Sequence, residues 1–287
     1  MSAKVVLVTG CSKGGIGFHL CEEFAKEGCT VYATARKVEK MEGFVHPSIH
    51  KLELDVVDDK SVKLVIDHVI EREGKIDVLV NNAGVPAFGN LYFQSQRPAL
   101  EVPLDEVKAA FDANVFSILR VSRAVLPHMA SRKQGLILNV GSVVGEIPTP
   151  WSGIYSASKA AAHSVTQSMW MECKPFNVKV MLVAPGGVTS NFVASYGPQY
   201  TLAPDSLYTA YLPHIIRRMW SSQTPQSMQT DVFAQKVVKQ ALASSPPFYF
   251  SAGNNATMFG FARWLPRTWM LRYLWGMFSG PVKNKSS

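Results

Sequence analysis

Tyr155 and Lys159 stand four residues apart in a segment of helical periodicity, which places both side chains on one helical face. A free tyrosine has a pKa of about 10 and is a poor acid–base catalyst at neutral pH. A lysine cation one turn away favours the phenolate and lowers that pKa, so the pair could donate a proton to a substrate. Tyrosine and lysine occur at this spacing in many helices, and its meaning therefore depends on neighbouring motifs.

Ser142 and Asn114 could complete a reaction centre around this pair. Ser142 follows an apolar run, and its hydroxyl could polarise a carbonyl oxygen while Tyr155 supplies the proton and a nicotinamide supplies hydride. Asn114 lies inside a long predicted helix, where an amide is disfavoured unless it is used. It could hold a water that relays protons to Lys159. Together these residues predict the reduction of a ketone.

A glycine-rich segment, Thr9–Gly17, lies between the first predicted strand and the first predicted helix. Glycines there let the chain turn sharply and let backbone N–H groups approach a pyrophosphate, which the positive end of the helix also attracts. A flexible turn could have the same composition, but its position between strand and helix favours a dinucleotide site. The predicted contacts are Gly10, Ser12, Lys13, Gly15 and Ile16.

The residue after the second predicted strand bears on which dinucleotide binds. An NAD site usually has an acid there for the ribose 2′-hydroxyl. This chain instead has Arg36, with Lys13 in the glycine turn. The two cations could clamp a 2′-phosphate, although they could also be two solvated basic residues. The predicted cofactor is NADPH, or NADP+ in the reverse direction.

Further cofactor contacts are expected where later strands end, because ligands of open α/β sheets bind at that edge. Asp55 could accept a hydrogen bond from the adenine amine, and the segment after the sixth strand could hold the nicotinamide amide. Asp55 and the Asn81–Gly84 segment could instead be ordinary strand-end turns. The residues concerned are Asp55, Asn82, Ala83, Gly84, Lys159, Pro185, Gly186, Val188 and Thr189.

Alternating strands and helices are needed to position these residues. Apolar, β-branched runs predict strands at Val5–Thr9, Thr30–Ala35, Ile49–Leu54, Ile76–Asn81, Gly135–Val140, Val178–Ala184 and Phe248–Phe250. Helical periodicity predicts helices at Gly15–Glu27, Asp59–Glu73, Leu104–Ser131, Gly153–Cys173 and Asp231–Ala243. Strands that are apolar throughout are typical of a parallel sheet with both faces covered. The prediction is an α/β doubly wound parallel sheet of Rossmann type, a three-layer αβα single domain.

In order and spacing, these motifs resemble those of the short-chain dehydrogenases/reductases along residues 4–255. The resemblance implies that Asn114, Ser142, Tyr155 and Lys159 form a catalytic tetrad and that Lys159 also holds the nicotinamide ribose. The glycine turn has one residue more than usual between Gly10 and Gly17, and in this it resembles fungal 1-acyldihydroxyacetone phosphate reductases. Residues 31–36 are also similar to those of hydroxysteroid and retinol dehydrogenases.

Two segments depart from the alternating pattern. Val188–Met228 is a long aromatic, proline-rich stretch that we interpret as a substrate lid. Gly89–Ser95 resembles the cleavage sequence of tobacco etch virus protease without its leading glutamate. Removing Asn90–Arg97 restores the family's spacing, so these residues are interpreted as an engineered insertion, the alternative being a natural aromatic loop beside the substrate.

Composition narrows the class of protein. Hydrophobic residues make up 47% of the 287 residues and charged residues 17%, which argues against disorder and suits one buried core. The four cysteines have neither metal-ligand nor disulfide spacing and predict buried reduced thiols, with no metal site. No secretory signal is visible ahead of the first strand. The expected location is cytoplasmic.

The C-terminal residues 256–287 are predicted to form a basic, aromatic tail after a catalytic domain at 1–255. The chain carries a net charge of +8, yet its last acidic residue is Asp231. Tryptophan and arginine together suit a membrane or lipid-droplet headgroup region, while Pro266 interrupts any spanning helix. The tail could instead pack over the substrate pocket or on a dimer partner. Nucleic-acid binding is excluded, because no organised basic patch or motif is present.

The leading functional prediction is NADPH-dependent reduction of a ketone on a hydrophobic substrate, with 1-acyldihydroxyacetone phosphate reduced to 1-acylglycerol 3-phosphate. An alternative is a steroid, retinoid or polyketide-type ketone. An alternative from another class is a non-catalytic nucleotide-binding protein that docks on membranes. The family resemblance also implies homo-oligomers through the two long helices. Peripheral contact with the endoplasmic reticulum or lipid droplets is a further expectation.

Overall fold

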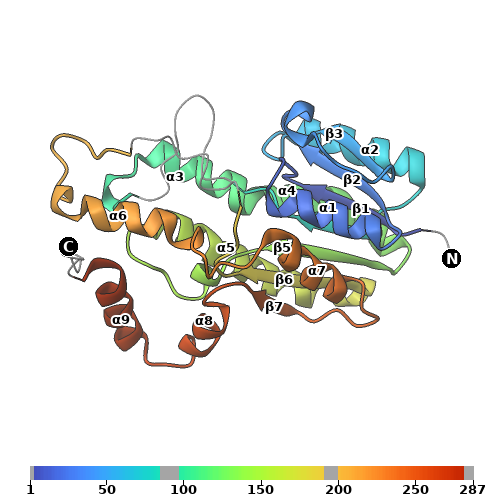
Figure 1. The fold of residues 1–287 in the computed structure, drawn as a ribbon. Helices are drawn as coiled ribbons and strands as arrows, with labels where there is room; N and C mark the ends of the chain where they lie inside the picture. Colours follow the sequence, from blue (N-terminus) through green and yellow to red (C-terminus); the bar gives the residue numbers. More distant parts are fainter. Residues whose placement is uncertain (1–2, 85–96, 191–199, 281–287) are drawn as a thin grey trace.

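A parallel sheet runs through the middle of the molecule in the computed structural model, which describes residues 3–84, 97–190 and 200–280 (Figure 1). The described residues form seven strands in the order β3-β2-β1-β4-β5-β6-β7, every adjacent pair being parallel. The strands are β1 (Val5–Thr9), β2 (Thr30–Ala35), β3 (Ile49–Glu53), β4 (Val78–Asn81), β5 (Gly135–Val140), β6 (Val178–Pro185) and β7 (Tyr249–Ala252).

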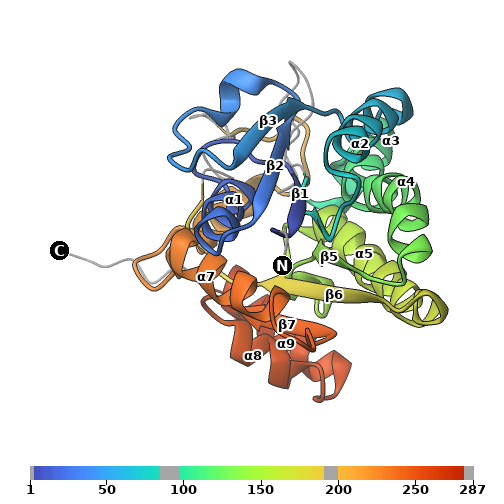
Figure 2. The ribbon, with the colours of Figure 1, turned by 90° about the vertical axis from the view of Figure 1, so that its right-hand side faces the viewer.

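Helices cover both faces of this sheet, as Figure 2 shows. The described helices are α1 (Ile16–Lys26), α2 (Asp59–Glu73), α3 (Leu104–Phe111), α4 (Ser117–Ser131), α5 (Gly153–Glu172), α6 (Leu212–Met219), α7 (Thr230–Ala241), α8 (Ala256–Ala262) and α9 (Arg267–Ser279), of which α1 and α7 cover one face and α2, α4 and α5 the other. Alternate residues of a strand point to opposite faces, so Val6 of β1 joins the core under α1 and α7, whereas Leu7 joins the core under α2, α4 and α5. The predicted doubly wound, three-layer α/β fold is confirmed.

Helix α1 illustrates why the predicted elements form. Leu20, Cys21 and Phe24 are buried and recur at helical spacing, so they make one apolar stripe against the sheet and α7. Element boundaries lie within two residues of those predicted, and β1, β2, β5 and α2 match the prediction. All four cysteines, each a described residue, are buried free thiols.

A buried polar network fastens the helices that carry the candidate site. The side-chain amide of Asn81 in β4 donates to Asn139 Oδ1 at 2.8 Å and to Ser122 Oγ of α4 at 3.0 Å. The amide of Asn139 in β5 donates in turn to Thr166 Oγ1 of α5 at 3.0 Å. Buried amides need such partners, so the network fixes α4 and α5 on the central strands.

The long helix predicted over Leu104–Ser131 has the expected extent but is not uniformly α-helical. A π-helical turn at Asp112–Phe116 separates α3 from α4 and contains Asn114. Single π-turns inside α-helices are often found at functional sites. Apolar periodicity carries no signal for such a turn.

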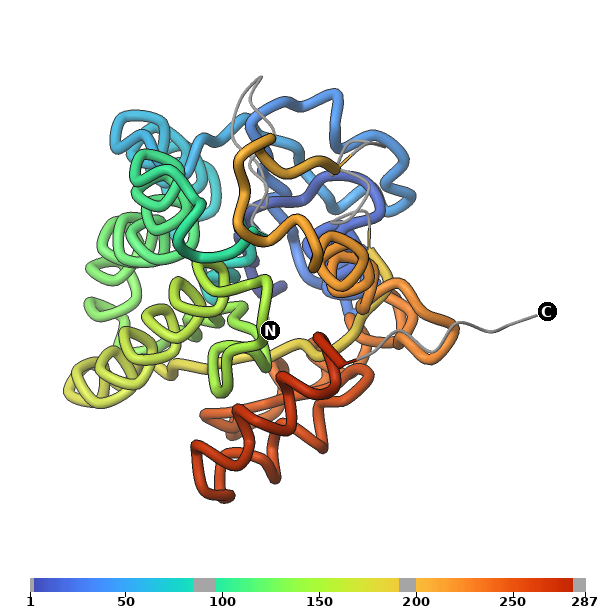
Figure 3. Tube along the Cα trace, turned by 90° about the vertical axis from the view of Figure 1, so that its left-hand side faces the viewer, coloured from blue at the N-terminus to red at the C-terminus, as the bar shows by residue number. Residues whose placement is uncertain are grey.

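Helices α6, α8 and α9 were not predicted, and Figure 3 looks onto the end of the molecule where α6 and α9 lie. Pro266 caps α9, which agrees with the predicted interruption of the tail. Helices α8 and α9 pack on the 3₁₀ turn Val143–Gly145 through Phe259, Met270 and Leu274. Within the described ranges, no helix is both long enough and apolar enough to cross a bilayer.

Parts of two predicted segments lie outside the described residues. Of the suspected insertion Asn90–Arg97, only Arg97 is described. The predicted lid is described at residues 188–190 and 200–228, where it contains α6.

Candidate active site

A cavity of about 590 Å³ opens where the strands end at their carboxyl edge. This is the place predicted for a ligand of an open α/β sheet. Most of the predicted site residues line it, namely Gly10, Ser12, Lys13, Gly15, Ile16, Arg36, Asp55, Asn82, Ala83, Gly84, Ser142, Tyr155, Lys159, Pro185, Gly186 and Val188. Asn114 and Thr189 are not among its described lining residues.

The glycine turn after β1 is built for close backbone approach. Gly10 has φ +74°, and a Cβ there would lie 2.7 Å from Ala83 Cα. A Cβ on Gly17 would lie 2.5 Å from Asn82 Nδ2, whose amide donates to the carbonyls of Thr9 and Gly10 at 2.9 and 3.0 Å. Asn82 therefore fastens the turn as well as lining the cavity. The turn and Ile16, the first residue of α1, line the cavity, which fits a dinucleotide pyrophosphate.

Lys13 and Arg36, which are predicted to favour NADPH over NADH, lie on neighbouring segments. The Lys13 N–H donates to Lys40 O at 2.8 Å, so the glycine turn runs beside the residues that follow β2. Lys13 and Arg36 both line the cavity, together with Asp55. One carboxylate and two cations at this end fit a ligand that carries both an adenine amine and a phosphate.

Tyr155 and Lys159 share one face of α5 and one cavity. The Lys159 Nζ lies 5.8 Å from the Tyr155 ring centroid and donates to Val140 O at 2.9 Å. Burial lowers the pKa of Lys159 to about 8. The ammonium group is therefore held beside the tyrosine with little contact with water.

Asn114 lies behind this pair rather than on the cavity wall. Its Nδ2 donates to Ser158 Oγ at 3.1 Å, and that hydroxyl donates to Tyr155 O at 2.8 Å. A Cβ on Gly84 would lie 3.1 Å from Asn114 Oδ1 and 3.5 Å from Lys159 Nζ. The amide oxygen and the ammonium thus face the same small space, which suits the predicted water relay.

Ser142 is held by two residues that sequence reasoning missed. Its N–H donates to His163 Nε2 at 3.3 Å, and His163 Nδ1 lies 3.3 Å from Glu146 Oε1. The hydrogen bond from His163 is the main cause that lowers the pKa of Glu146. His163 follows Lys159 by one helical turn, a spacing that could have identified it.

Thr189 bonds to the residues ahead of α7, and its predicted contact with the cofactor stays a prediction. Its N–H donates to Met228 O at 2.9 Å, and its hydroxyl lies 3.3 Å from the same oxygen. These bonds tie the end of β6 to the residues before α7. Val188 and Ser190, its chain neighbours, line the cavity in its place.

The remaining cavity wall includes residues of the predicted lid and of the C-terminal tail, whose packing over the substrate pocket was one of the alternatives. None of these residues was predicted individually. The apolar residues of this wall are Val143, Val144, Met219, Phe259, Met277 and Phe278. Its polar residues include Thr149, Arg218, Ser221 and Ser222. Helices α6, α8 and α9 therefore complete the space beside Tyr155.

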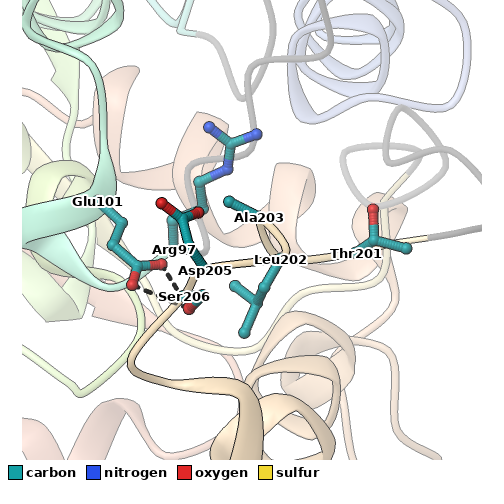
Figure 4. Close-up of a pocket in the computed structure, with 7 residues that line it drawn as sticks. All are labelled: Arg97, Glu101, Thr201, Leu202, Ala203, Asp205 and Ser206. Atoms are coloured by element: carbon teal, nitrogen blue, oxygen red, sulfur yellow. Dashed lines mark hydrogen bonds between the residues drawn. The ribbon is translucent and has the colours of Figure 1, made fainter.

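A second cavity, of about 440 Å³, contains none of these residues (Figure 4). Ser206 Oγ donates to the Glu101 carboxylate there, with distances of 2.9 and 2.8 Å to its two oxygens. The contact ties the turn before α3 to the described end of the lid. This cavity holds none of the tetrad residues.

A turn shaped for a pyrophosphate shares one cavity with a serine, a tyrosine and a buried lysine. Backbone amides can hold a dinucleotide, and the three side chains can polarise and protonate a carbonyl oxygen. These features define the class as dinucleotide-dependent oxidoreductases.

Comparison with known proteins gives the family. The family model for short chain dehydrogenases matches residues 4–201, and the chain belongs to that family. A short-chain dehydrogenase of Penicillium ochrochloron, ptmH, is 34% identical over 84% of this chain and 86% of its own length. A short-chain dehydrogenase structure from Streptomyces avermitilis superposes with a TM-score of 0.76 at 28% identity, covering 96% of this chain and 95% of that one.

The NADPH-dependent 1-acyldihydroxyacetone phosphate reductase of Schizosaccharomyces pombe is also similar. It is 37% identical over 186 residues, which are 64% of this chain and 60% of that reductase. The match thus spans less than two thirds of the relative. The predicted family resemblance is confirmed.

Proposed function

We propose that this protein reduces a ketone on a hydrophobic substrate with NADPH, converting 1-acyldihydroxyacetone phosphate into 1-acylglycerol 3-phosphate. The observation that carries the proposal is the single cavity in which Ser142, Tyr155 and Lys159 meet an apolar wall from α8 and α9. The similarity to the Schizosaccharomyces pombe reductase supports this choice of substrate.

The preference for NADPH is supported by Lys13 and Arg36. Both line the cavity, and Arg36 stands after β2, where an acid would favour NAD. When bound, the cofactor supplies the hydride that the ketone carbon accepts. The glycine turn would hold its pyrophosphate, and Asp55 would hold its adenine amine.

The protein's own residues would handle the oxygen of the ketone. Ser142 Oγ donates a hydrogen bond to the carbonyl oxygen and withdraws charge from the carbon. As that carbon receives hydride, the Tyr155 hydroxyl gives its proton to the oxygen and an alcohol results. Lys159 favours the resulting phenolate, and Asn114 holds a water through which the proton is replaced.

Contact with a lipid surface is a second part of the proposal. The outer face of α8 and α9 exposes 71% of Phe261, 77% of Trp264 and 56% of Trp269. Arg263, Arg267 and Arg272 accompany them, and the sequence has no acid after Asp231. This combination suits an anionic headgroup region. The protein would then act in the cytoplasm at the surface of the endoplasmic reticulum or of lipid droplets, as a monomer or homo-oligomer.

Loss of NADPH absorbance with a panel of ketones tests the substrate. The panel contains 1-acyldihydroxyacetone phosphate, a steroid, a retinoid, a polyketide-type ketone and 3-ketodihydrosphingosine. The last is included because a reductase of that name from Bacteroides thetaiotaomicron is 32% identical over 67% of this chain. Turnover of another ketone in preference to the acyl phosphate would make the proposed substrate wrong.

Tyr155→Phe separates the enzyme from a non-catalytic nucleotide-binding protein. We expect turnover to fall by at least about 100-fold, because the proton donor is removed while the ring remains. Binding of NADPH, followed by fluorescence, should persist. Unchanged turnover in the variant would contradict the proposed role of Tyr155 and favour the non-catalytic alternative.

A further inference from the structure

Four cationic side chains line the described part of the active-site cavity. Lys13 and Arg36 lie on the segments that follow β1 and β2, and Lys159 lies at the reaction centre. The fourth, Arg218, comes from the last turn of α6 in the predicted lid. It lies on neither the glycine-turn segment nor the β2 end, so neither the proton transfer nor the predicted dinucleotide contacts use its charge.

We propose that Arg218 binds the phosphate group of an amphiphilic ketone substrate and so selects phosphorylated over unphosphorylated ketones. This inference rests on the proposed function and adds the residue that recognises the charged end of the substrate.

Arg218 is held by neutral hydroxyl groups on either side. Its Nε donates to Thr149 Oγ1 at 2.9 Å, and its Nη1 donates to Ser221 Oγ at 2.7 Å. Arginine presents its donors as a planar fork that matches the oxygens of a phosphate. These hydroxyl contacts fix the direction of the fork.

The partner Thr149 connects Arg218 to the reaction centre. Thr149 is buried, lines the cavity, and belongs to the segment that links Ser142 to Tyr155. The segment from Ser142 to Tyr155 therefore carries the two hydroxyls that are expected to bind the ketone oxygen. It also carries Thr149, which positions the guanidinium of Arg218. A substrate with its phosphate near its ketone could reach both.

The surroundings of Arg218 suit the other end of such a substrate as well. Its guanidinium carbon lies 5.2 Å from the ring centroid of Phe278. Phe278 and Met277 of α9, with Met219 of α6, give this part of the cavity apolar walls. A cation beside apolar walls fits a small anionic group attached to a hydrocarbon chain better than it fits a neutral sterol.

The test compares two ketones that differ only in phosphate, 1-palmitoyldihydroxyacetone phosphate and 1-palmitoyldihydroxyacetone. For Arg218→Gln, we expect KM for the phosphorylated ketone to rise by about tenfold or more, because a charge-assisted hydrogen bond is lost. Its kcat, its turnover of the unphosphorylated ketone and its NADPH affinity should stay near those of the wild type. Arg218→Lys keeps the charge and should recover part of the loss.

Arg217→Gln is the matched control. Arg217 is the preceding residue of α6, and its Nη2 donates to Met277 O at 3.2 Å without lining the cavity. We expect this variant to leave the ratio of the two ketones unchanged. Titration of 1-palmitoylglycerol 3-phosphate into the NADP+ complex gives a readout without turnover, in which only the Arg218 variants should bind more weakly.

The possible results separate this inference from the proposed function. If the wild type reduces the phosphorylated ketone and Arg218→Gln changes both ketones equally, or neither, Arg218 is not the phosphate contact. If Arg218→Gln mainly weakens NADPH binding, Arg218 belongs to the cofactor site and the inference is wrong. If Arg218→Gln does not fold, Arg218→Lys decides by the same ratio. If the wild type reduces neither ketone, the proposed substrate itself is wrong.

Discussion

Lys159 combines burial with a positive charge beside Tyr155. Only 5% of its surface is exposed, and this burial lowers its pKa to about 8. Below that pH the ammonium favours the tyrosinate that forms when the ketone is protonated. Above it, the neutral amine no longer provides that stabilisation. The buried ammonium group of Lys159 therefore destabilises the folded protein, and the size of this effect depends on pH.

We expect deprotonation of Lys159 to make the free energy of unfolding rise with pH. Below about pH 8 the folded and unfolded chains both carry the Lys159 proton, and burying the charge destabilises the fold. Between about pH 8 and 10.5 the unfolded chain keeps the proton that the folded chain has lost, so stability increases with pH. Over this window the wild type should gain roughly 3 kcal/mol relative to Lys159→Met. Urea unfolding at several pH values measures it; parallel curves for the two proteins would contradict the prediction.

In the proposed reaction, His163 would act through Ser142. Its Nε2 accepts the Ser142 N–H, and Glu146 lies against its Nδ1. We expect His163→Leu to lower kcat for ketone reduction by about tenfold, because an unsatisfied buried N–H lets the serine move. KM and NADPH affinity should change little, and His163→Gln, which offers an amide oxygen, should recover part of the rate. A uniform loss of stability with kcat intact would mean that His163 serves only the fold.

At the scale of elements, the site is built from the segments that join one helix or strand to the next. The turn from β1 to α1 approaches Asn82 and Ala83 after β4, and the π-turn between α3 and α4 carries Asn114. The Val143–Gly145 turn after β5 carries the contacts of α8 and α9. At the first of these junctions the backbone segments approach too closely for a Cβ atom at Gly10 or Gly17.

Gly17→Ala tests the first of these junctions. The new Cβ would lie 2.5 Å from Asn82 Nδ2 and 2.6 Å from Gly10 O, so the turn must shift. We expect a loss of about 1–3 kcal/mol in stability, as for other overpacked sites, together with weaker NADPH binding. Gly260→Ala in α8 is the control, since its Cβ would meet nothing within 4 Å. Thermal unfolding and NADPH titration measure both, and equal behaviour of the two variants would contradict the account.

For the whole molecule, α8 and α9 have two faces with different surroundings. One face contributes Phe259, Met277 and Phe278 to the cavity, and the other exposes Phe261, Trp264 and Trp269. A lipid surface against the outer face would thus lie one helix away from the apolar wall of the cavity. With the proposed membrane contact, an apolar substrate would have a short path from the lipid surface to Tyr155.

Replacing Phe261, Trp264 and Trp269 together by serine tests this path. We expect less protein to sediment with phosphatidylserine vesicles, and the binding of the wild type to weaken in high salt because arginines contribute to it. Turnover of a water-soluble ketone should not change. Val45→Ser with Leu64→Ser, which removes two side chains 79% and 70% exposed on other elements, is the control. Unchanged vesicle binding would argue against a lipid surface, and conversion of a dimer to a monomer would assign the face to self-association.

The sequence by itself determined the sheet, the helices that cover its two faces and the common edge at which most of the predicted site residues lie. Strands buried on both faces are apolar throughout, and helices packed on one side have apolar stripes, so local patterns report both. Because parallel strands end at one edge, residues such as Gly10, Asp55 and Pro185 could be placed together before any contact was known.

Tertiary structure alone decided what surrounds the reaction centre. The π-turn at Asn114, the support of Ser142 by His163, the position of Arg218 and the folding of α9 over the cavity have no periodic signal in the chain. They arise from contacts between segments distant in sequence, which form only after the sheet and its helices have packed. Chemistry that depends on local spacing was therefore predictable, whereas the shape and charge of the substrate pocket were not.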